Sequence, residues 1–109
     1  MYELIFDSKV LSSLEKLPKE IRTRIINKLL DSKINPFHYF EKLSGREEYK
    51  LRVGDYRIIA DINNKEILIF ILLIDHRRRI YKNFKWNNIK LNYPNFLLYF
   101  AVFSAKLKD

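Results

Sequence analysis

The feature that most constrains the fold of this chain is the continuous apolar run Ile67–Ile74, which reads ILIFILLI. A strand with apolar side chains on both faces needs other layers to cover both faces. The run is therefore predicted to be a strand at the centre of a sheet. It is too short to cross a membrane, which takes ~20 apolar residues, and the same holds for Phe96–Ala105. No membrane partner is expected.

Two helices are predicted before this strand. Tyr2–Phe6 has the pattern of a short strand, and Asp7 or Ser8 can cap a helix that begins at Lys9. Pro18 ends this helix and is the first residue of a second one, where its missing N–H is harmless. The apolar residues that follow helical spacing are Val10, Leu11, Leu14 and Leu17 in the first helix, and Ile21, Ile25, Leu29 and Leu30 in the second. The helices are expected to form a hairpin.

A β-hairpin is predicted after a loop at Lys33–Gly45. Its strands are Glu48–Val53 and Tyr56–Ile62, joined by Gly54 and Asp55 as a two-residue turn. A second tight turn follows at NNKE, where Asn63-Asn64 suits positive φ. The side chains expected to face the core are Tyr49, Leu51, Val53, Tyr56, Ile58 and Ala60.

The order of these elements predicts an α+β fold, β-α-α-β-β-β. Two N-terminal helices pack on one face of a small antiparallel sheet, and the other face is free. A further short strand is expected near Arg79–Lys82. Residues 1–82 form the predicted domain, and 83–109 form a C-terminal extension that ends in a helix. That helix is apolar around its circumference, so it completes the core or packs against another chain.

Charge and composition narrow the partners. The 109 residues carry a formal net charge of +8, which indicates an anionic partner such as nucleic acid or an acidic protein. There is no cysteine, which is consistent with a reducing cytoplasm and excludes disulfides and thiolate metal sites. The opening MYELIFDSK lacks the basic start of a signal peptide, so a cytoplasmic location is expected.

The basic residues are predicted to gather at one end of the sheet. A two-residue turn places Arg52 directly opposite Arg57, with Lys50 on the same face. The exit of the apolar strand brings His76 and Arg77 beside them. At an effective dielectric of ~20, two charges ~5 Å apart repel by on the order of 3 kcal/mol, less once screened. A bound polyanion or an acidic protein would compensate; otherwise the side chains spread into water.

The same residue types suit RNA cleavage without a metal ion. The 2′-hydroxyl attacks the adjacent phosphate, which requires a proton acceptor, charge stabilisation and a proton donor. Guanidinium groups bind phosphate bidentately, and a lysine crowded by arginines gives up its proton more readily. Asp61 and Asp75 are too few to hold a pair of divalent ions, so no metal and no cofactor is expected.

Four segments resemble the RelE/ParE toxin superfamily, nearest its RelE branch. They are KLPKEIRTRI, NPF with KLSG, YKLRVGDYRIIADI and IDHRRRIY, in the same order and spacing over roughly residues 1–82. The resemblance implies a toxin of a toxin–antitoxin system, an endoribonuclease that cuts mRNA in the ribosomal A site and inhibits translation. It also implies a cognate RelB-like antitoxin, which forms a hetero-oligomer with the toxin and blocks it.

The resemblance also assigns roles to individual residues. It implies that Arg57 and Arg77 hold the scissile phosphate and that Lys50 helps to activate the 2′-hydroxyl. Arg52 matches the arginine that follows the family's strand lysine. Tyr81 matches the tyrosine of the last motif and is expected to stack on the message.

The proton donor and the reaction itself stay open. Arg77 is a poor acid, and His76 is an alternative donor because histidine exchanges a proton near neutral pH. A second family lysine has no match, since Glu47 and Glu48 occupy that region. Three functions remain: a ribosome-dependent endoribonuclease, a ParE-like toxin that binds DNA gyrase without nuclease activity, and a non-catalytic nucleic-acid-binding protein.

Overall fold

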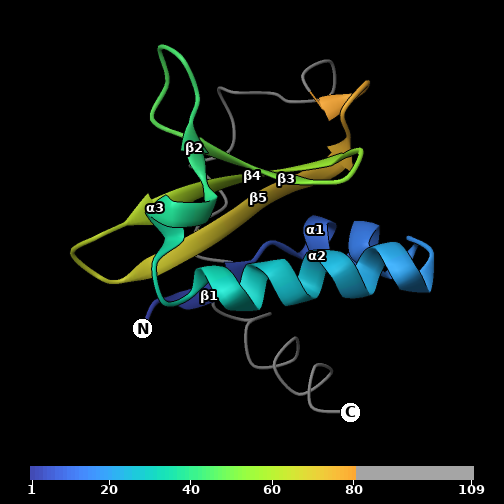
Figure 1. Ribbon diagram of the computed structural model, residues 1–109, viewed down its shortest axis with the longest axis horizontal. Helices are drawn as coiled ribbons and strands as arrows, with labels where there is room; N and C mark the ends of the chain where they lie inside the picture. The colour runs from blue at the N-terminus through green and yellow to red at the C-terminus, as the bar shows by residue number, and fades with distance from the viewer. Residues whose placement is uncertain (81–109) are drawn as a thin grey trace.

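The computed structural model describes residues 1–80 as two helices packed under a twisted sheet (Figure 1). Everything assigned above to residues 81–109, including the C-terminal helix, lies outside the described residues. Among residues 1–80, no helix is long and apolar enough to span a membrane. The elements are β1 (Glu3–Phe6), α1 (Ser8–Glu15), α2 (Lys19–Ser32), α3 (Pro36–Tyr39), β2 (Glu41–Lys42), β3 (Tyr49–Val53), β4 (Tyr56–Asn63) and β5 (Leu68–His76).

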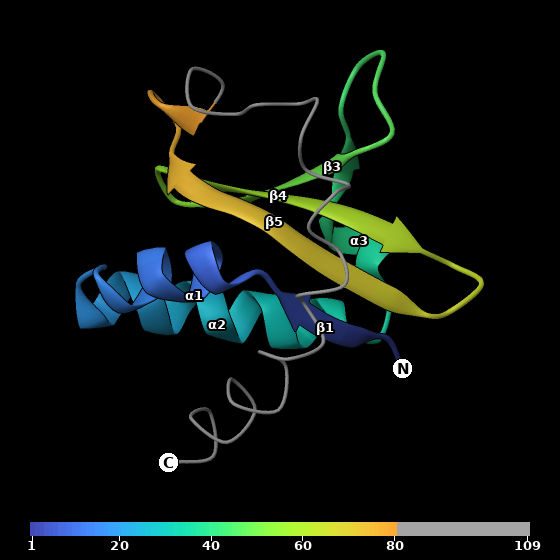
Figure 2. The same cartoon turned by 180° about the vertical axis from the view of Figure 1, so that it is seen from behind.

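The sheet is mixed and has five strands in the order β1-β5-β4-β3-β2. β1 pairs in parallel with β5, from Glu3↔Leu68 to Phe6↔Ile71, so the expectation of a purely antiparallel sheet was wrong. The reason is that the backbone N–H and C=O groups on the second edge of β5 need hydrogen-bond partners. β1, which precedes the helices, supplies them and runs parallel to β5. β5 is interior, as predicted, but β4 holds the middle position (Figure 2).

The helices cover one face of the sheet, as predicted. Val10 and Leu14 of α1 and Ile25 and Leu29 of α2 are buried in one cluster with the inward side chains of the strands. Leu30 departs from the predicted stripe and is 38% exposed. The strand residues in this cluster are Leu4, Phe6, Leu51, Val53, Ile58, Ala60, Ile69, Ile71 and Ile74.

The other face of the sheet is not free, which corrects the expectation above. A second cluster of buried apolar side chains lies there: Ile5, Leu43, Ile59, Phe70, Leu72 and Ile80. Ile59 is fully buried although its neighbours along β4, Ile58 and Ala60, face the helices. The apolar side chains of β5 point alternately to the two faces of the sheet and contribute to both clusters, as a continuously apolar strand requires.

The helix boundaries lie within a few residues of the predicted ones: α1 begins at Ser8 and not Lys9, and it ends at Glu15, before Pro18. Asp7 is the N-cap of α1, and its side chain accepts a hydrogen bond from the Lys9 amide at 3.4 Å. Pro18 is the N-cap of α2. The helix therefore begins at Lys19, one residue later than predicted. Lys33–Gly45 is not a plain loop, because Pro36 opens the short α3 and two residues pair as β2.

The first hairpin has the predicted register. Val53 pairs with Tyr56 and Arg52 with Arg57, and Gly54 takes φ +57° in the turn between them. The second turn differs from prediction, since its positive φ falls on Ile67 at +60°. Asn63 remains in β4, and its side chain accepts hydrogen bonds from the amides of Lys65 and Glu66. The expected strand at Arg79–Lys82 is also wrong at Arg79, which lies in a turn.

The two glycines with positive φ allow a matched test of the hairpin turn. Gly45→Ala and Gly54→Ala should each lower the free energy of unfolding by about 1–2 kcal/mol, because a Cβ is strained in the left-handed region. Gly54→Ala should cost more, since its Cβ would lie 3.3 Å from an Arg24 guanidinium nitrogen while Gly45 has open space. Urea denaturation measures both; a Gly54→Ala variant as stable as wild type would contradict the turn geometry.

Candidate active site

The predicted convergence of Arg57 and Arg77 occurs at the β3–β4 turn. Arg57 donates from Nη1 to the carbonyl oxygens of Gly54 and Tyr56, each at 2.9 Å. The Arg77 amide donates to the Asp55 carbonyl at 2.7 Å, and Arg77 Nε lies 3.6 Å from Asp55 Oδ1. Both arginines, twenty residues apart in the chain, therefore contact one two-residue turn and its flank.

The topology explains this meeting. The β4–β5 ladder pairs Arg57 with Asp75 and ends at Tyr56↔His76. The chain leaving β5 consequently runs past the β3–β4 turn, which places Arg77 beside Asp55. Figures 1 and 2 show this turn and the end of β5 at the same end of the sheet.

Arg52 lies directly opposite Arg57, as predicted, and is exposed. Like charges in this position destabilise a ladder. The repulsion is reduced because the Arg57 guanidinium turns toward backbone carbonyls of the turn, which are the negative ends of peptide dipoles.

Two carboxylates lie among the cations, and sequence reasoning did not assign them to the site. Asp55 pairs with Arg77, but both side chains are more than half exposed, so this pair alone contributes little, ~0–1 kcal/mol. Asp75 is 18% exposed and lies 3.2 Å from Arg79 Nε. Asp75 Oδ1 also accepts from the His76 amide at 2.7 Å. Extending the predicted ladder past β5 would have identified the Asp55–Arg77 contact.

Lys50 lies on the same face as Arg52, two ladder pairs farther from the turn. It pairs across the ladder with Ile59 on one side and with Glu41 of β2 on the other. Its Nζ is 4.0 Å from the Glu41 carboxylate. Lys50 thus has an anionic neighbour, Glu41, in a segment that was predicted to be a loop and is strand β2. Arg52 lies between Lys50 and the turn.

His76 lies on the other face of the sheet. It pairs with Tyr56, the two rings meet edge to face with centroids 5.6 Å apart, and Tyr56 packs against the helix-side core. His76 Nδ1 accepts from the Arg78 amide at 3.2 Å. The structure therefore does not bring the His76 side chain to Arg57. Tyr81 lies outside the described residues.

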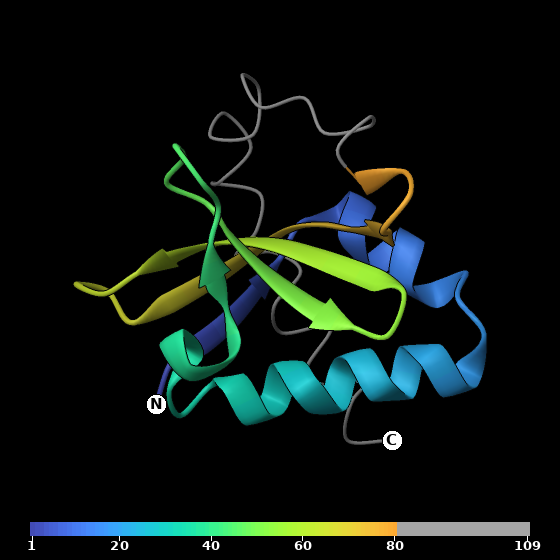
Figure 3. The same cartoon turned by 45° about the horizontal axis from the view of Figure 1, so that its top comes forward.

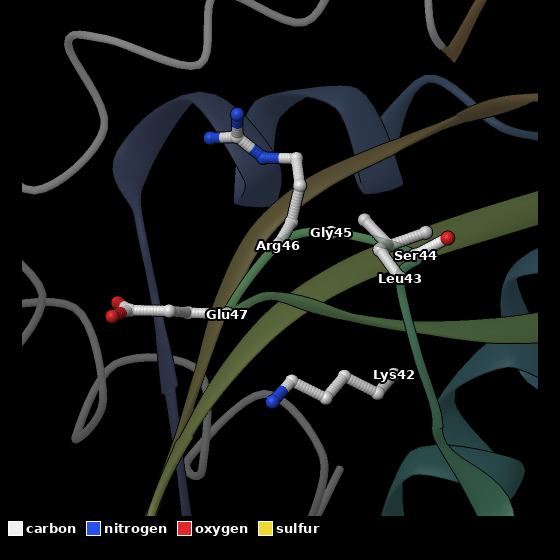
Figure 4. A pocket seen from close by; sticks show the side chains of 6 residues that line it. All are labelled: Lys42, Leu43, Ser44, Gly45, Arg46 and Glu47. Carbon is white, nitrogen blue, oxygen red and sulfur yellow. The ribbon is translucent and has the colours of Figure 1, made fainter.

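Two other features of residues 1–80 were candidates for a functional site, and neither brings together side chains from distant parts of the sequence. Residues 1–80 contain no group of three or more potential metal ligands. A hollow of about 490 Å³ lies on the β2–β3 loop, lined only by the consecutive residues 42–47. Its polar side chains point in different directions, with Arg46 and Glu47 extending outward (Figure 4). It includes none of the predicted site residues.

Comparison with solved structures defines the class of fold. A chain of the RelBE2 toxin–antitoxin complex from Mycobacterium tuberculosis is similar with a TM-score of 0.64 and 25% identity, over 70% of this chain and 98% of that one. The archaeal RelE–RelB complex from Pyrococcus horikoshii OT3 gives 0.63 and 29%, over 72% and 97%. The isolated RelE toxin from E. coli gives 0.61 and 23%, over 70% and 84%, which shows the fold alone. The chain thus has the fold of RelE-like toxins.

The family follows from the sequence. Residues 4–81 match the family model described as ParE toxin of type II toxin–antitoxin systems. The chain therefore belongs to the RelE/ParE toxin superfamily and is a toxin of a type II toxin–antitoxin system. A search of curated protein sequences finds no match.

Two ion pairs near the start of β3 predict contrasting effects on stability. Lys50→Met should change the free energy of unfolding by less than about 0.5 kcal/mol, because its partner Glu41 is exposed and 4.0 Å away. Glu48→Ala should cost about 1–3 kcal/mol, because the Glu48 carboxylate is 8% exposed and accepts two hydrogen bonds from Arg46. Chemical denaturation compares the two; equal losses would contradict the assigned burial.

Proposed function

We propose that this toxin is a metal-independent, ribosome-dependent endoribonuclease that cleaves mRNA in the A site and so inhibits translation. The observation that supports this function is the presence of Arg57 and Arg77 at one turn. Two guanidinium groups, one from β4 and one from the turn after β5, can stabilise the negative charge that develops on one phosphate during RNA cleavage. Residues 1–82 are the proposed toxin domain, acting in the cytoplasm where ribosomes are.

The proposed reaction is attack of the 2′-oxygen on the adjacent phosphorus. The bond from phosphorus to the 5′-oxygen breaks, leaving a cyclic phosphate and a new 5′-hydroxyl. Negative charge grows on the phosphate oxygens, and positively charged donors fixed in advance stabilise it. Arg57 uses Nη1 for turn carbonyls, and no residue among 1–80 accepts from its Nε or Nη2. Those donors are the ones proposed to bind the phosphate.

The other site residues have proposed supporting roles. Lys50 is the proposed group that helps to take the 2′ proton, and Arg52 adds positive charge on the same face. Tyr81 is proposed to stack on a base of the message. His76 fits the role of proton donor poorly, because it pairs with Tyr56 on the helix-covered face. Arg77 is then the remaining candidate to donate a proton to the leaving 5′-oxygen.

A second function is favoured by one specific finding. The matching family model is that of ParE, so a toxin that binds DNA gyrase and has no nuclease activity is the alternative. Such a toxin needs a protein-binding surface and has no need for two arginines at a fixed spacing. In vitro translation separates the two functions, since only the nuclease cuts translated messages.

The partners follow from the similar structures and the charge. Two of the similar chains come from RelB–RelE-type complexes, and we propose a cognate RelB-like antitoxin that forms a hetero-oligomer with this toxin. An antitoxin that places acidic side chains over the cationic end of the sheet would cover Arg57 and Arg77 and block the message.

The double variant Arg57→Ala with Arg77→Ala tests the proposed site. It should lose message cleavage at least 100-fold, because removing one preorganised donor typically costs 10²–10³ in rate. The measurement is in vitro translation followed by primer extension, which maps the new 5′ ends. Circular dichroism should show an unchanged fold, since both side chains contact only a surface turn.

A matched control removes the same charge elsewhere. Lys9→Ala with Lys65→Ala lies on α1 and on the β4–β5 turn, away from Arg57, and should cleave like wild type. If the Arg57/Arg77 variant cuts translated messages at the wild-type rate, the site is elsewhere. If wild type leaves messages intact and instead stalls gyrase supercoiling, the alternative function is correct.

A further inference from the structure

The β3–β4 turn holds both arginines through its backbone. The Arg57 guanidinium donates to the carbonyls of Gly54 and Tyr56, and the Arg77 backbone amide donates to the carbonyl of Asp55. The Arg77 Nε lies 3.6 Å from the Asp55 carboxylate, so the position of this turn affects where both guanidinium groups lie. Gly54 and Asp55 are both exposed, so little packing from their own side chains fixes the turn.

Helix α2 supplies a fixed point for the turn. Lys28 Nζ donates to the carbonyl of Arg52, the last-but-one residue of β3, at 2.7 Å. The Arg24 guanidinium lies against Gly54, within 3.3 Å of where a Cβ would be. α2 is itself anchored in the core, so these contacts tie the exposed turn to a rigid element. Figure 3 shows the turn above α2.

We propose that Lys28 and Asp55 are positioning residues, which hold the β3–β4 turn and through it set the spacing of Arg57 and Arg77. This inference rests on the proposed endoribonuclease function and adds two residues to it. Lys28 acts from the helix side by holding the strand that leads into the turn. Asp55 acts from the other side by holding Arg77 through its carbonyl and its carboxylate.

The chemistry explains why spacing matters. A displacement of about 1 Å in a positioned group can cost 10²-fold in rate. A carboxylate beside a phosphate-binding arginine also weakens phosphate binding by repulsion, so Asp55 should lower the affinity for phosphate while it orients Arg77.

A competing role for Lys28 is direct binding of an RNA phosphate. The two roles give different kinetics. Removing a phosphate-binding lysine raises KM and flattens the dependence of binding on salt, whereas removing a positioning lysine lowers kcat. For Asp55 the signature is sharper, because removing its carboxylate should lower kcat while KM falls or stays the same.

The experiment uses Lys28→Met and Asp55→Asn in the full-length toxin. On ribosomes programmed with a translated message, Lys28→Met should lower kcat about fivefold, with KM unchanged, as expected when one hydrogen bond is removed. Asp55→Asn should lower kcat about threefold, because its ion pair is exposed. Lys28→Arg keeps a donor and should restore most of the rate.

A second readout does not depend on activity. The Arg77 amide is bonded to the Asp55 carbonyl, and hydrogen exchange reports how often that bond opens. Its exchange should be faster in Lys28→Met than in wild type. The matched control Lys65→Met, on the β4–β5 turn, should change neither the rate nor this exchange.

The outcomes are distinguishable. Unchanged kcat with raised KM in Lys28→Met would make Lys28 a phosphate-binding residue and overturn the inference. Higher kcat in Asp55→Asn would do the same, since it would make the carboxylate an inhibitor. If wild type cuts no message, the proposed function fails, and the Arg77 amide then decides: unchanged exchange in Lys28→Met overturns the positioning role, and faster exchange supports it.

Discussion

The pairing of β5 along both edges is the constraint on which the rest of the structure depends. Its apolar side chains need cover on both faces, and its backbone needs a partner on each side. β1 fills one edge in parallel and β4 fills the other. The same ladder that fills the core ends at Tyr56↔His76 and directs the chain past the β3–β4 turn. Burial of the core and placement of Arg77 thus have one cause, and a shift in register would disturb both.

The positive charges at the cationic end of the sheet are interleaved with hydrogen-bond acceptors and carboxylates. Arg57 bonds to carbonyls, Arg77 lies beside Asp55, and Arg79 lies beside Asp75. The Asp55–Arg77 pair is exposed enough to be weak alone, whereas Asp75 is mostly buried. Together they orient the guanidinium groups at the surface, and the remaining donors of Arg57 are left for an anion such as a phosphate diester.

Local signals explain which parts could be predicted. The Gly54-Asp55 turn fixed the hairpin register, and with it the face shared by Lys50, Arg52 and Arg57, because a two-residue turn allows one alignment. The partner of β1 could not be predicted, since nothing near Glu3–Phe6 encodes a parallel pairing with a strand sixty residues away. β2 is two residues long and has no pattern of its own. The prediction that His76 lies beside Arg57 failed for a different reason. Side chains alternate along a strand, and His76 pairs with Tyr56, which faces the helices.

The match to a ParE family model and the likeness to RelE structures describe one fold, and a fold does not decide a reaction. The site offers a physical distinction. A surface that only binds a protein tolerates mobile arginines, whose ordering entropy is lost on binding. A catalyst for phosphodiester cleavage gains from donors that are fixed before the substrate arrives, because they need no reorganisation as charge develops. Arg57, held by two carbonyls through one nitrogen while its other donors have no acceptor among residues 1–80, is fixed in this sense. That arrangement is the physical ground for proposing the nuclease function.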